Sequence, residues 1–564
     1  MIVSALFQGD GVLAAIAAGL DTMSRTRNDA GDAVGKIQTA LRSWDPDSLP
    51  VHGIDKSYGG ETAAAVRRFQ ISVLGTPAAT ATDELGPRTV LGLDRVQAAV
   101  ENPPMPSAER IRRNVWRLST GRGWDPTLLA YAHAVRTMKA RPADDPTSWV
   151  FQANLHGTFR TALADADLGH DGDRFFLPWH RMYLHHFEQI LLDTVIGNGG
   201  PADFALPYWN YGNPEPQSTL PYPFRDVDLA LPDGSPNPLA LPAPLRSAEV
   251  MAGNPLSPSI TSTFTAMWQP SFSGAMRTGF SGQLQNIPHG AVHGAIGGDA
   301  GAGPGPAGNV ALMSSTDAAA HDPVFWLHHA NLDRLWVQWL ERHANPTDAA
   351  WLDAEFRFFG ADGEPVTSRV GDVLDHVRGL GYRYDDQSEQ AARPRRLIPV
   401  APSPSLVAAT ADPTEVTRRT TAWLTVPDDS RPAIEHAPDT AAAAGFGAAL
   451  LTVDFLAAQR NPGIVYQVYL NLPETETGPR ADRYLAGTFS LFGVDADGSL
   501  GFTFDITTLV QTLASAKRWD PAALSVTVQP VRPTTGAHAG TVESGAPAET
   551  AVPLRIGRIG LYVG

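Results

Sequence analysis

The feature that most constrains the fold is an apolar helical run, Ala320–Trp336, with two adjacent histidines, His328 and His329, in its middle. A helix so rich in Trp, Leu and Val is expected to be buried, and a buried imidazole needs a hydrogen-bond partner or a metal ion. Upstream, His289 and His293 lie four residues apart, which places them on one face of a helical turn. The chain must therefore build a core in which helices bring imidazoles together.

The composition limits the available ligands and partners. Among 564 residues there is no cysteine, so disulfides, thiolate metal sites and cysteine nucleophiles are excluded. A metal ion would have to bind histidine or carboxylate. With 43 basic and 59 acidic residues the formal net charge is -16, which makes nucleic acid and anionic membranes poor partners.

The first residues predict a soluble protein. Met1–Ser4 has no charged region ahead of apolar residues, and the apolar run Leu13–Leu20 is too short to span a bilayer. We therefore expect no removable signal and no membrane segment, which favours the cytoplasm over secretion.

A chain of 564 residues is too long to fold around one hydrophobic core, so several domains are expected. In residues 1–98, apolar positions follow helical spacing from Val34 to Leu41 and again from Thr62 to Phe69. This segment resembles the peptidoglycan-binding-like three-helix module, which implies either glycan contact or a docking and packing element. The Pro-rich stretch Glu101–Pro106 then predicts a linker.

Residues 105–385 predict a mainly α-helical bundle with large loops. Helical spacing covers Arg110–Leu118, Thr127–Lys139, Arg181–Ile196 and Val324–Glu341.

Ten of the 16 histidines fall between His156 and His329. They form two sets of three: His156, His170 and His180, then His289, His293 and one of the pair His328/His329. Imidazole binds copper in both oxidation states, so two such sites suit a pair of copper ions, each with an open position. Zinc accepts three histidines but has no use for a matched second set.

Several longer stretches around these histidines are distinctive: Met138–Pro146, Gln152–His156, Phe176–Arg181, Leu206–Asn210, Ile287–His293 and Asp322–His329. Together they resemble the tyrosinase and polyphenol oxidase family, nearer the plant type with its catechol oxidases than the short bacterial tyrosinases. The resemblance extends from about residue 105 to about residue 530.

The resemblance implies a binuclear type-3 copper site and assigns its ligands. His156, His170 and His180 would hold copper A, and His289, His293 and His329 would hold copper B. His329 is preferred to His328 because the family ligand lies seven residues after the Asp of the Asp-Pro motif, here Asp322. His328 would then lie behind the site. Asp333 is expected to accept a proton from a ligand imidazole or from Arg334.

The chain also departs from the family pattern. His170 and His180 are ten residues apart where the family usually has nine, and Arg160 stands where plant-type members have a cysteine joined to a ligand histidine. Gln285 replaces a carboxylate that helps deprotonate monophenols, and Gly290 replaces an assisting Asn. Because an amide does not ionise, Gln285 can only orient a water molecule. The position of the aromatic gate of plant enzymes falls at Ser315 or Thr316, where a small residue would leave the copper A side open.

The C-terminal part predicts a linker and a β-sandwich. Residues 386–416 lose periodicity and become rich in Pro and Ala. In residues 417–564, short runs either alternate apolar with polar residues or are apolar throughout, as β-strands do. These runs are 422–426, 450–455, 464–470, 485–492 and 524–528. This part resembles the plant C-terminal domain that shields the copper site of latent enzymes with one apolar residue, here Leu491 or Phe492.

These features together predict a multidomain dicopper oxidase that uses dioxygen on a small phenolic substrate. Ortho-diphenols or ortho-aminophenols would be converted to quinones or quinone imines, with weak action on monophenols and with latency until the C-terminal domain is displaced. Two alternatives stay open: a tyrosinase with full monophenol hydroxylation, and a hemocyanin-like dioxygen carrier.

Overall fold

The computed structural model describes residues 2, 4–45, 47–74, 76–101, 110–118, 121, 123–157, 174–274, 278–298, 311–387, 405–444, 449–459, 461–494, 500–534, 548–551 and 553–564. The described chain divides into two units, Met1–Glu109 and Arg110–Gly564. None of the described helices is both long enough and apolar enough to cross a bilayer.

The first unit is helical. Its helices are α1 (Gly11–Ala17), η1 (Arg25–Arg27), α2 (Asp32–Trp44), α3 (Gly60–Ser72) and α4 (Pro87–Glu101). The helices α2 and α3 cover the two runs of helical spacing expected from the sequence, and α1 and α4 add to them. The Asp10 carboxylate caps α1 by accepting from the amides of Val12 and Leu13. A pocket of about 300 Å³ in this unit is lined by threonines, among them Thr80 and Thr82. Glycan contact through this unit stays a prediction.

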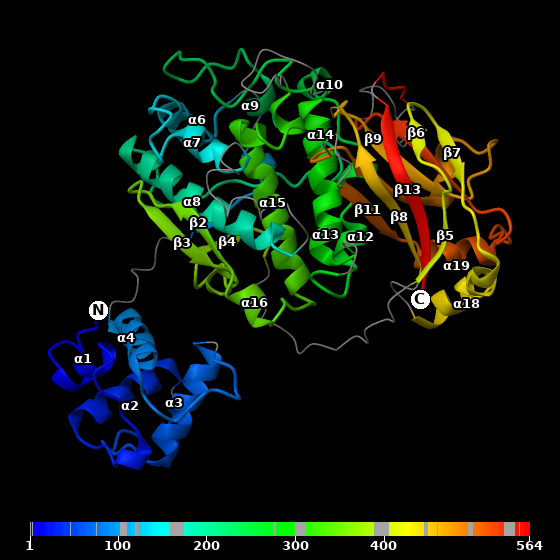
Figure 1. Ribbon diagram of the computed structural model, residues 1–564. Helices are drawn as coiled ribbons and strands as arrows, with labels where there is room; N and C mark the ends of the chain where they lie inside the picture. Colours follow the sequence, from blue (N-terminus) through cyan, green and yellow to red (C-terminus); the bar gives the residue numbers. More distant parts are fainter. Residues whose placement is uncertain are drawn as a thin grey trace. The chain divides into compact units, whose positions relative to one another are not determined.

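The second unit begins with a helical region (Figure 1). Its α-helices are α5 (Val115–Leu118), α6 (Pro126–Lys139), α7 (Trp149–Asn154), α8 (Phe176–Gly197), α9 (Tyr222–Arg225), α10 (Ala248–Met251), α11 (Pro258–Thr261), α12 (Phe264–Met267), α13 (Phe280–Leu284), α14 (Ala291–Gly297), α15 (Pro323–Leu340) and α16 (Ala349–Leu352). A π-helical turn, η4 (Gln285–Gly290), joins α13 to α14, and two 3-10 turns, η5 (Leu312–Ser314) and η6 (Ala319–His321), precede α15. A hairpin of β2 (Glu355–Phe359) and β3 (Pro365–Arg369), followed by η7 (Val370–Val373), covers one side of α8.

The helix α15 forms where the apolar run predicts it. The Asp322 carboxylate caps its start by accepting from the Val324 amide, and Pro323 occupies the first turn, where its missing N–H costs nothing. Asp322 also pairs with Arg246, and both side chains are fully buried. Because Arg246 comes from the long loop that follows α9, this pair fastens that loop to the start of α15.

The segment Arg110–Leu118 differs from its predicted helix. Arg110–Arg112 forms β1, which pairs in parallel with β4 (Tyr382–Tyr384), and only Val115–Leu118 is helical. A partner strand about 270 residues away overrides the local periodicity, since β pairing depends on neighbours that the local sequence does not contain.

The C-terminal region holds two antiparallel sheets. One has the order β10-β9-β12-β7 and the other the order β11-β8-β13-β5, with β6 also on β13. The strands are β5 (Ser405–Ala409), β6 (Thr414–Val416), β7 (Thr420–Trp423), β8 (Ala449–Ala457), β9 (Val465–Leu470), β10 (Leu485–Ser490), β11 (Leu500–Asp505), β12 (Ser525–Val531) and β13 (Leu554–Val563). Helices α17 (Arg431–Glu435), α18 (Ala437–Ala444) and α19 (Thr507–Ser515) and the turns η8 (Asp428–Ser430) and η9 (Gly478–Tyr484) lie between them. Both sheets supply side chains to one hydrophobic core.

Two of these strands fall inside the stretch 386–416 that the sequence assigns to a linker. β5 pairs with the end of β13 and β6 pairs with its beginning. The long strand β13 was not expected from the sequence, so its partners looked unstructured. The second half of the expected linker is therefore part of the sheet.

A buried ion-pair network joins α8 to α15 beneath their histidines. The Asp333 carboxylate on α15 accepts from Arg181 on α8 at 2.6 Å and from Arg112 on β1 at 3.4 Å. Arg112 also donates to Glu188 on α8 at 2.7 Å. Burial raises the pKa of Asp333, but the two guanidinium groups outweigh it and lower the pKa to about 2. Two arginines thus neutralise two carboxylates in a dry core, where each charge depends on its partner.

We predict that Asp333→Asn lowers the free energy of unfolding of the second unit by about 3–5 kcal/mol, because it leaves Arg181 and Arg112 buried against an uncharged amide. The measurement is urea denaturation followed by tryptophan fluorescence. Asp372→Asn is the matched control: its side chain is 64% exposed and pairs with Arg369, so its loss should cost under about 1 kcal/mol. Equal shifts of the two variants would contradict the assigned importance of the network.

Candidate metal centre

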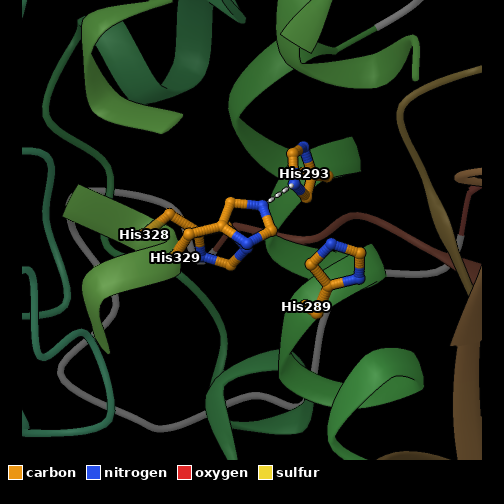
Figure 2. Close-up of side chains that lie close together, drawn as sticks. All are labelled: His289, His293, His328 and His329. Atoms are coloured by element: carbon orange, nitrogen blue, oxygen red, sulfur yellow. Dashed lines mark hydrogen bonds between the residues drawn. The ribbon is translucent and has the colours of Figure 1, made fainter. Parts of the chain in front are cut away.

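Two groups of buried histidines meet between α8, α14 and α15. The first contains His156, His180 and His329, and the second contains His289, His293, His328 and His329. Within each group the potential ligand atoms all lie within 4.8 Å of one another. Figure 2 shows the second group, in which the rings converge from the η4–α14 segment and from α15. His329 belongs to both groups.

Two of these rings are oriented by their own helices. His180 Nδ1 donates to the Phe176 carbonyl at 2.8 Å, and His289 Nδ1 donates to the Gln285 carbonyl at 3.0 Å. In both cases the acceptor lies four residues earlier in the chain. The local backbone therefore fixes which ring nitrogen faces inward, through the helix α8 for His180 and through η4, which is kinked at Ile287, for His289.

Two other rings are oriented by a remote loop. His156 Nδ1 donates to the Thr316 carbonyl at 2.8 Å, and His293 Nδ1 donates to the Met313 carbonyl at 2.9 Å. The segment Leu312–Thr316 thus orients one ring from each group. Backbone carbonyls leave no mark in the sequence, so this role could not be found from residue types.

The first group contains a contact that a metal ion would explain. Because the Nδ1 atoms of His156 and His180 both donate to carbonyls, their Nε2 atoms in neutral rings both carry lone pairs. These Nε2 atoms face each other at 3.4 Å. A proton shared between them would create an imidazolium, yet burial and the neighbouring imidazoles hold the pKa of His180 well below its usual value. A cation between the two acceptors removes the repulsion.

The second group also fits a metal. Burial lowers the pKa of His289 to about 3 and depresses the pKa of His293, His328 and His329 well below 6.5. The rings are therefore neutral at physiological pH, which is the form that binds metals. Among the described residues, His289 Nε2 is buried with no hydrogen-bond partner. All-imidazole donor sets of this kind suit copper.

The adjacent residues His328 and His329 occupy different places. The His329 ring stacks on His180 with centroids 4.2 Å apart, and its Nε2 lies 3.3 Å from Nε2 of His293. The His328 ring lies 4.8 Å from that of His293 and parallel to that of His289, and both its nitrogens are buried with no partner among the described residues. His328 is thus a member of the second group. The sequence had instead placed it behind the site.

The remaining predicted residues have mixed outcomes. His170 and Arg160 lie outside the described residues. Gln285 is half-buried on η4, one turn before His289, and Gly290 is buried directly after it. Ser315 and Thr316, the expected gate positions, are half-buried in the loop that orients His156.

The expected link between Asp333 and Arg334 is wrong. Arg334 pairs with Asp386 and donates to Asn331, whereas Asp333 accepts from Arg181, Arg112, Tyr382 and Tyr384. Side chains of neighbouring helical residues point about 100° apart, so Asp333 faces α8 while Arg334 faces the segment after β4.

The C-terminal region contributes a side chain to the centre. The Phe492 ring stacks on His293 with centroids 4.0 Å apart at 18°, and meets the edge of His289 at 5.4 Å. Leu491 instead lies in the core of the two sheets. Of the two residues singled out in the sequence, Phe492 is thus the one at the histidines.

Family comparisons agree with this arrangement. Residues 146–269 and 248–342 match the common central domain of tyrosinase, and residues 345–395 match the polyphenol oxidase middle domain. Residues 403–563, which hold the C-terminal sheets, match a domain of unknown function.

Individual relatives extend the match. Tyrosinase HcTyr1 of Hahella sp. (strain CCB-MM4) is 31% identical over 483 residues, covering 75% of this chain and 95% of the relative. Polyphenol oxidase II of Ipomoea batatas is 29% identical over 310 residues, and the match covers 50% of each chain, so this chain spans about half the length of that plant relative. The solved structure of latent apple tyrosinase gives a TM-score of 0.56 at 22% identity, covering 82% of this chain and 98% of that one.

We predict that His329→Ala loses the metal of the second group, because the Nε2 atom of His329 faces that of His293 at 3.3 Å. His328→Ala should retain nearly all of its metal, since three other histidines remain in its group. Copper content after loading and desalting, measured by mass spectrometry, distinguishes the two. His343→Ala is the control, because His343 donates to the Trp339 carbonyl outside both groups. Equal loss in the first two variants would contradict the unequal roles.

Proposed function

The chain belongs to the tyrosinase and polyphenol oxidase family of binuclear copper enzymes, and we propose that it oxidises ortho-diphenols or ortho-aminophenols with dioxygen. In this proposal His156, His170 and His180 hold copper A, and His289, His293 and His329 hold copper B. The observation that carries it is the facing pair of Nε2 atoms on His156 and His180, 3.4 Å apart, beside a second, all-imidazole group.

The chain's own residues would hold the copper ions and orient the histidine rings. The carbonyls of Thr316, Phe176, Gln285 and Met313 keep the Nδ1 protons of four histidines on the outside, so that the Nε2 atoms face inward. Bound copper would supply the dioxygen binding and the electron acceptance that no side chain offers. Each ortho-diphenol would lose two electrons and two protons to become a quinone, and dioxygen would end as water.

Substrate scope follows from the groups next to copper B. A monophenol must lose its proton before it can be hydroxylated, and a nearby base makes that step efficient. Gln285, one turn before His289, cannot ionise. Among the described histidines of the two groups, His328 alone is not assigned to a metal, and burial holds its pKa well below the usual value, so it is a weak base. This favours substrates that already carry two ortho donors.

The position of Phe492 supports latency. We read the C-terminal sheets as a β-sandwich that shields the centre, since its Phe492 ring lies against His293 and His289 where a phenolic ring would have to approach. Stacked aromatic contacts of this kind contribute about 0.5–1.5 kcal/mol beyond area burial. Substrate would therefore have to displace this ring before it reaches the metals.

We expect wild-type enzyme to oxidise catechols much faster than monophenols, and Gln285→Glu to raise the ratio of monophenol to catechol turnover, because a carboxylate can accept the phenolic proton. General-base contributions are typically about 10²–10⁴-fold. The measurement is oxygen uptake on one monophenol, one catechol and one ortho-aminophenol. The catechol rate of the same variant serves as its internal control. Rapid monophenol turnover by the wild type would instead support full tyrosinase activity.

We expect Phe492→Ala to raise catechol oxidation by the untreated, copper-loaded chain by up to about tenfold, which matches the loss of a stacking contact near 1.4 kcal/mol. Phe455→Ala is the control in the same region, because Phe455 is 56% exposed and lies away from the histidines. An unchanged rate for Phe492→Ala would contradict the shielding role. Reversible dioxygen binding without turnover in this variant would favour the carrier alternative.

A further inference from the structure

The segment before His289 is fastened to the C-terminal sheets. Gln283 Nε2 donates to the Thr503 carbonyl on β11 at 2.9 Å, and Asn286 Nδ2 donates to the Thr488 carbonyl on β10 at 3.1 Å. Both amide side chains are buried. Since hydrogen bonds from buried side chains to backbone fix position along a strand, these two contacts set the register of β10 and β11 against η4.

Gly290 lies against the end of β10. A Cβ atom at Gly290 would lie 2.9 Å from Ser490 Oγ and 3.6 Å from Phe492 Cβ. Ser490 is 1% exposed, and its Oγ accepts from the Phe492 amide at 3.3 Å. The Ser490 hydroxyl therefore fills the space that a side chain at position 290 would need and also holds the turn that aims Phe492.

We propose that Gly290 and Ser490 together hold Phe492 over His293, so that a side chain at position 290 displaces the Ser490 hydroxyl from the Phe492 amide and loosens the contact of Phe492 with the centre. The proposal rests on the latency proposed above and adds the residue pair that sets it. Position 290, which also bears on substrate scope, then cannot be changed without changing latency. Substrate scope and latency are therefore coupled, because both depend on the absence of a side chain at Gly290.

The next glycine on the same helical face supplies a matched comparison. A Cβ at Gly294 would meet Asn461 of the C-terminal region at 3.6 Å, an ordinary contact distance. Gly290→Ala and Gly294→Ala thus add the same methyl group toward the same region. The methyl at position 290 comes too close to Ser490, whereas the methyl at position 294 makes an ordinary contact with Asn461. Gly290→Asn adds a larger group at the occupied position.

The test uses the full chain in two forms. Metal-free protein is examined by hydrogen exchange with mass spectrometry over residues 485–494, and copper-loaded protein is assayed for catechol oxidation without activation. Gly290→Asn should speed exchange in this segment and raise turnover on the order of tenfold, equivalent to about 1.4 kcal/mol. Gly290→Ala should do so less, and Gly294→Ala should match the wild type in both.

A variant at Ser490 tests the other half of the residue pair. Ser490→Ala removes the hydroxyl that accepts from the Phe492 amide, so it should also speed exchange in residues 485–494 and raise turnover. Wild-type exchange in either Gly290→Asn or Ser490→Ala would overturn the proposal. Because hydrogen exchange needs neither copper nor substrate, it reports on the residue pair even if the proposed oxidase activity is wrong.

Discussion

The geometry of the metal centre depends on the buried pair between Asp333 and Arg181. His180 immediately precedes Arg181 on α8, and His329 lies one helical turn before Asp333 on α15, so the ion pair fixes the rotation and the register of the two helices that carry these ligands. The result is seen in the stacked rings of His180 and His329, 4.2 Å apart. Charges in a dry core tolerate little misalignment, because each displaced charge loses its compensation.

A second constraint comes from the loop Leu312–Thr316. Its carbonyls orient one histidine from each group, and the Ser314 carbonyl in turn accepts from Asn461 of the C-terminal region at 3.5 Å. The same region places Phe492 on His293. The C-terminal sheets therefore contact both the metal-facing side of the centre and the backbone that supports it, which suits a region that controls access.

In the proposed function, position 290 links substrate scope to shielding. The residue after His289 lies against the end of β10. A glycine there admits Ser490, and Ser490 positions Phe492.

The sequence alone determined the elements with strong local signals. The apolar spacing predicted 324–341 as a helix, and α15 spans Pro323–Leu340. Residue type and spacing also selected His156, His180, His289, His293 and the pair His328/His329, which the structure brings together, whereas His170 lies outside the described residues. Imidazole chemistry and helical periodicity are properties of the residues themselves, so they can be recognised without coordinates.

Only the tertiary structure decided the features that depend on distant partners. Arg110–Arg112 became a strand because Tyr382–Tyr384 lies beside it, and residues 405–409 became β5 because β13 supplies a neighbour. The partners of Asp333, the carbonyls that orient His156 and His293, and the choice of Phe492 over Leu491 likewise come from segments far apart in the chain. Backbone carbonyls occur at every residue and strand neighbours are set by folding, so neither leaves a pattern that the local sequence could reveal.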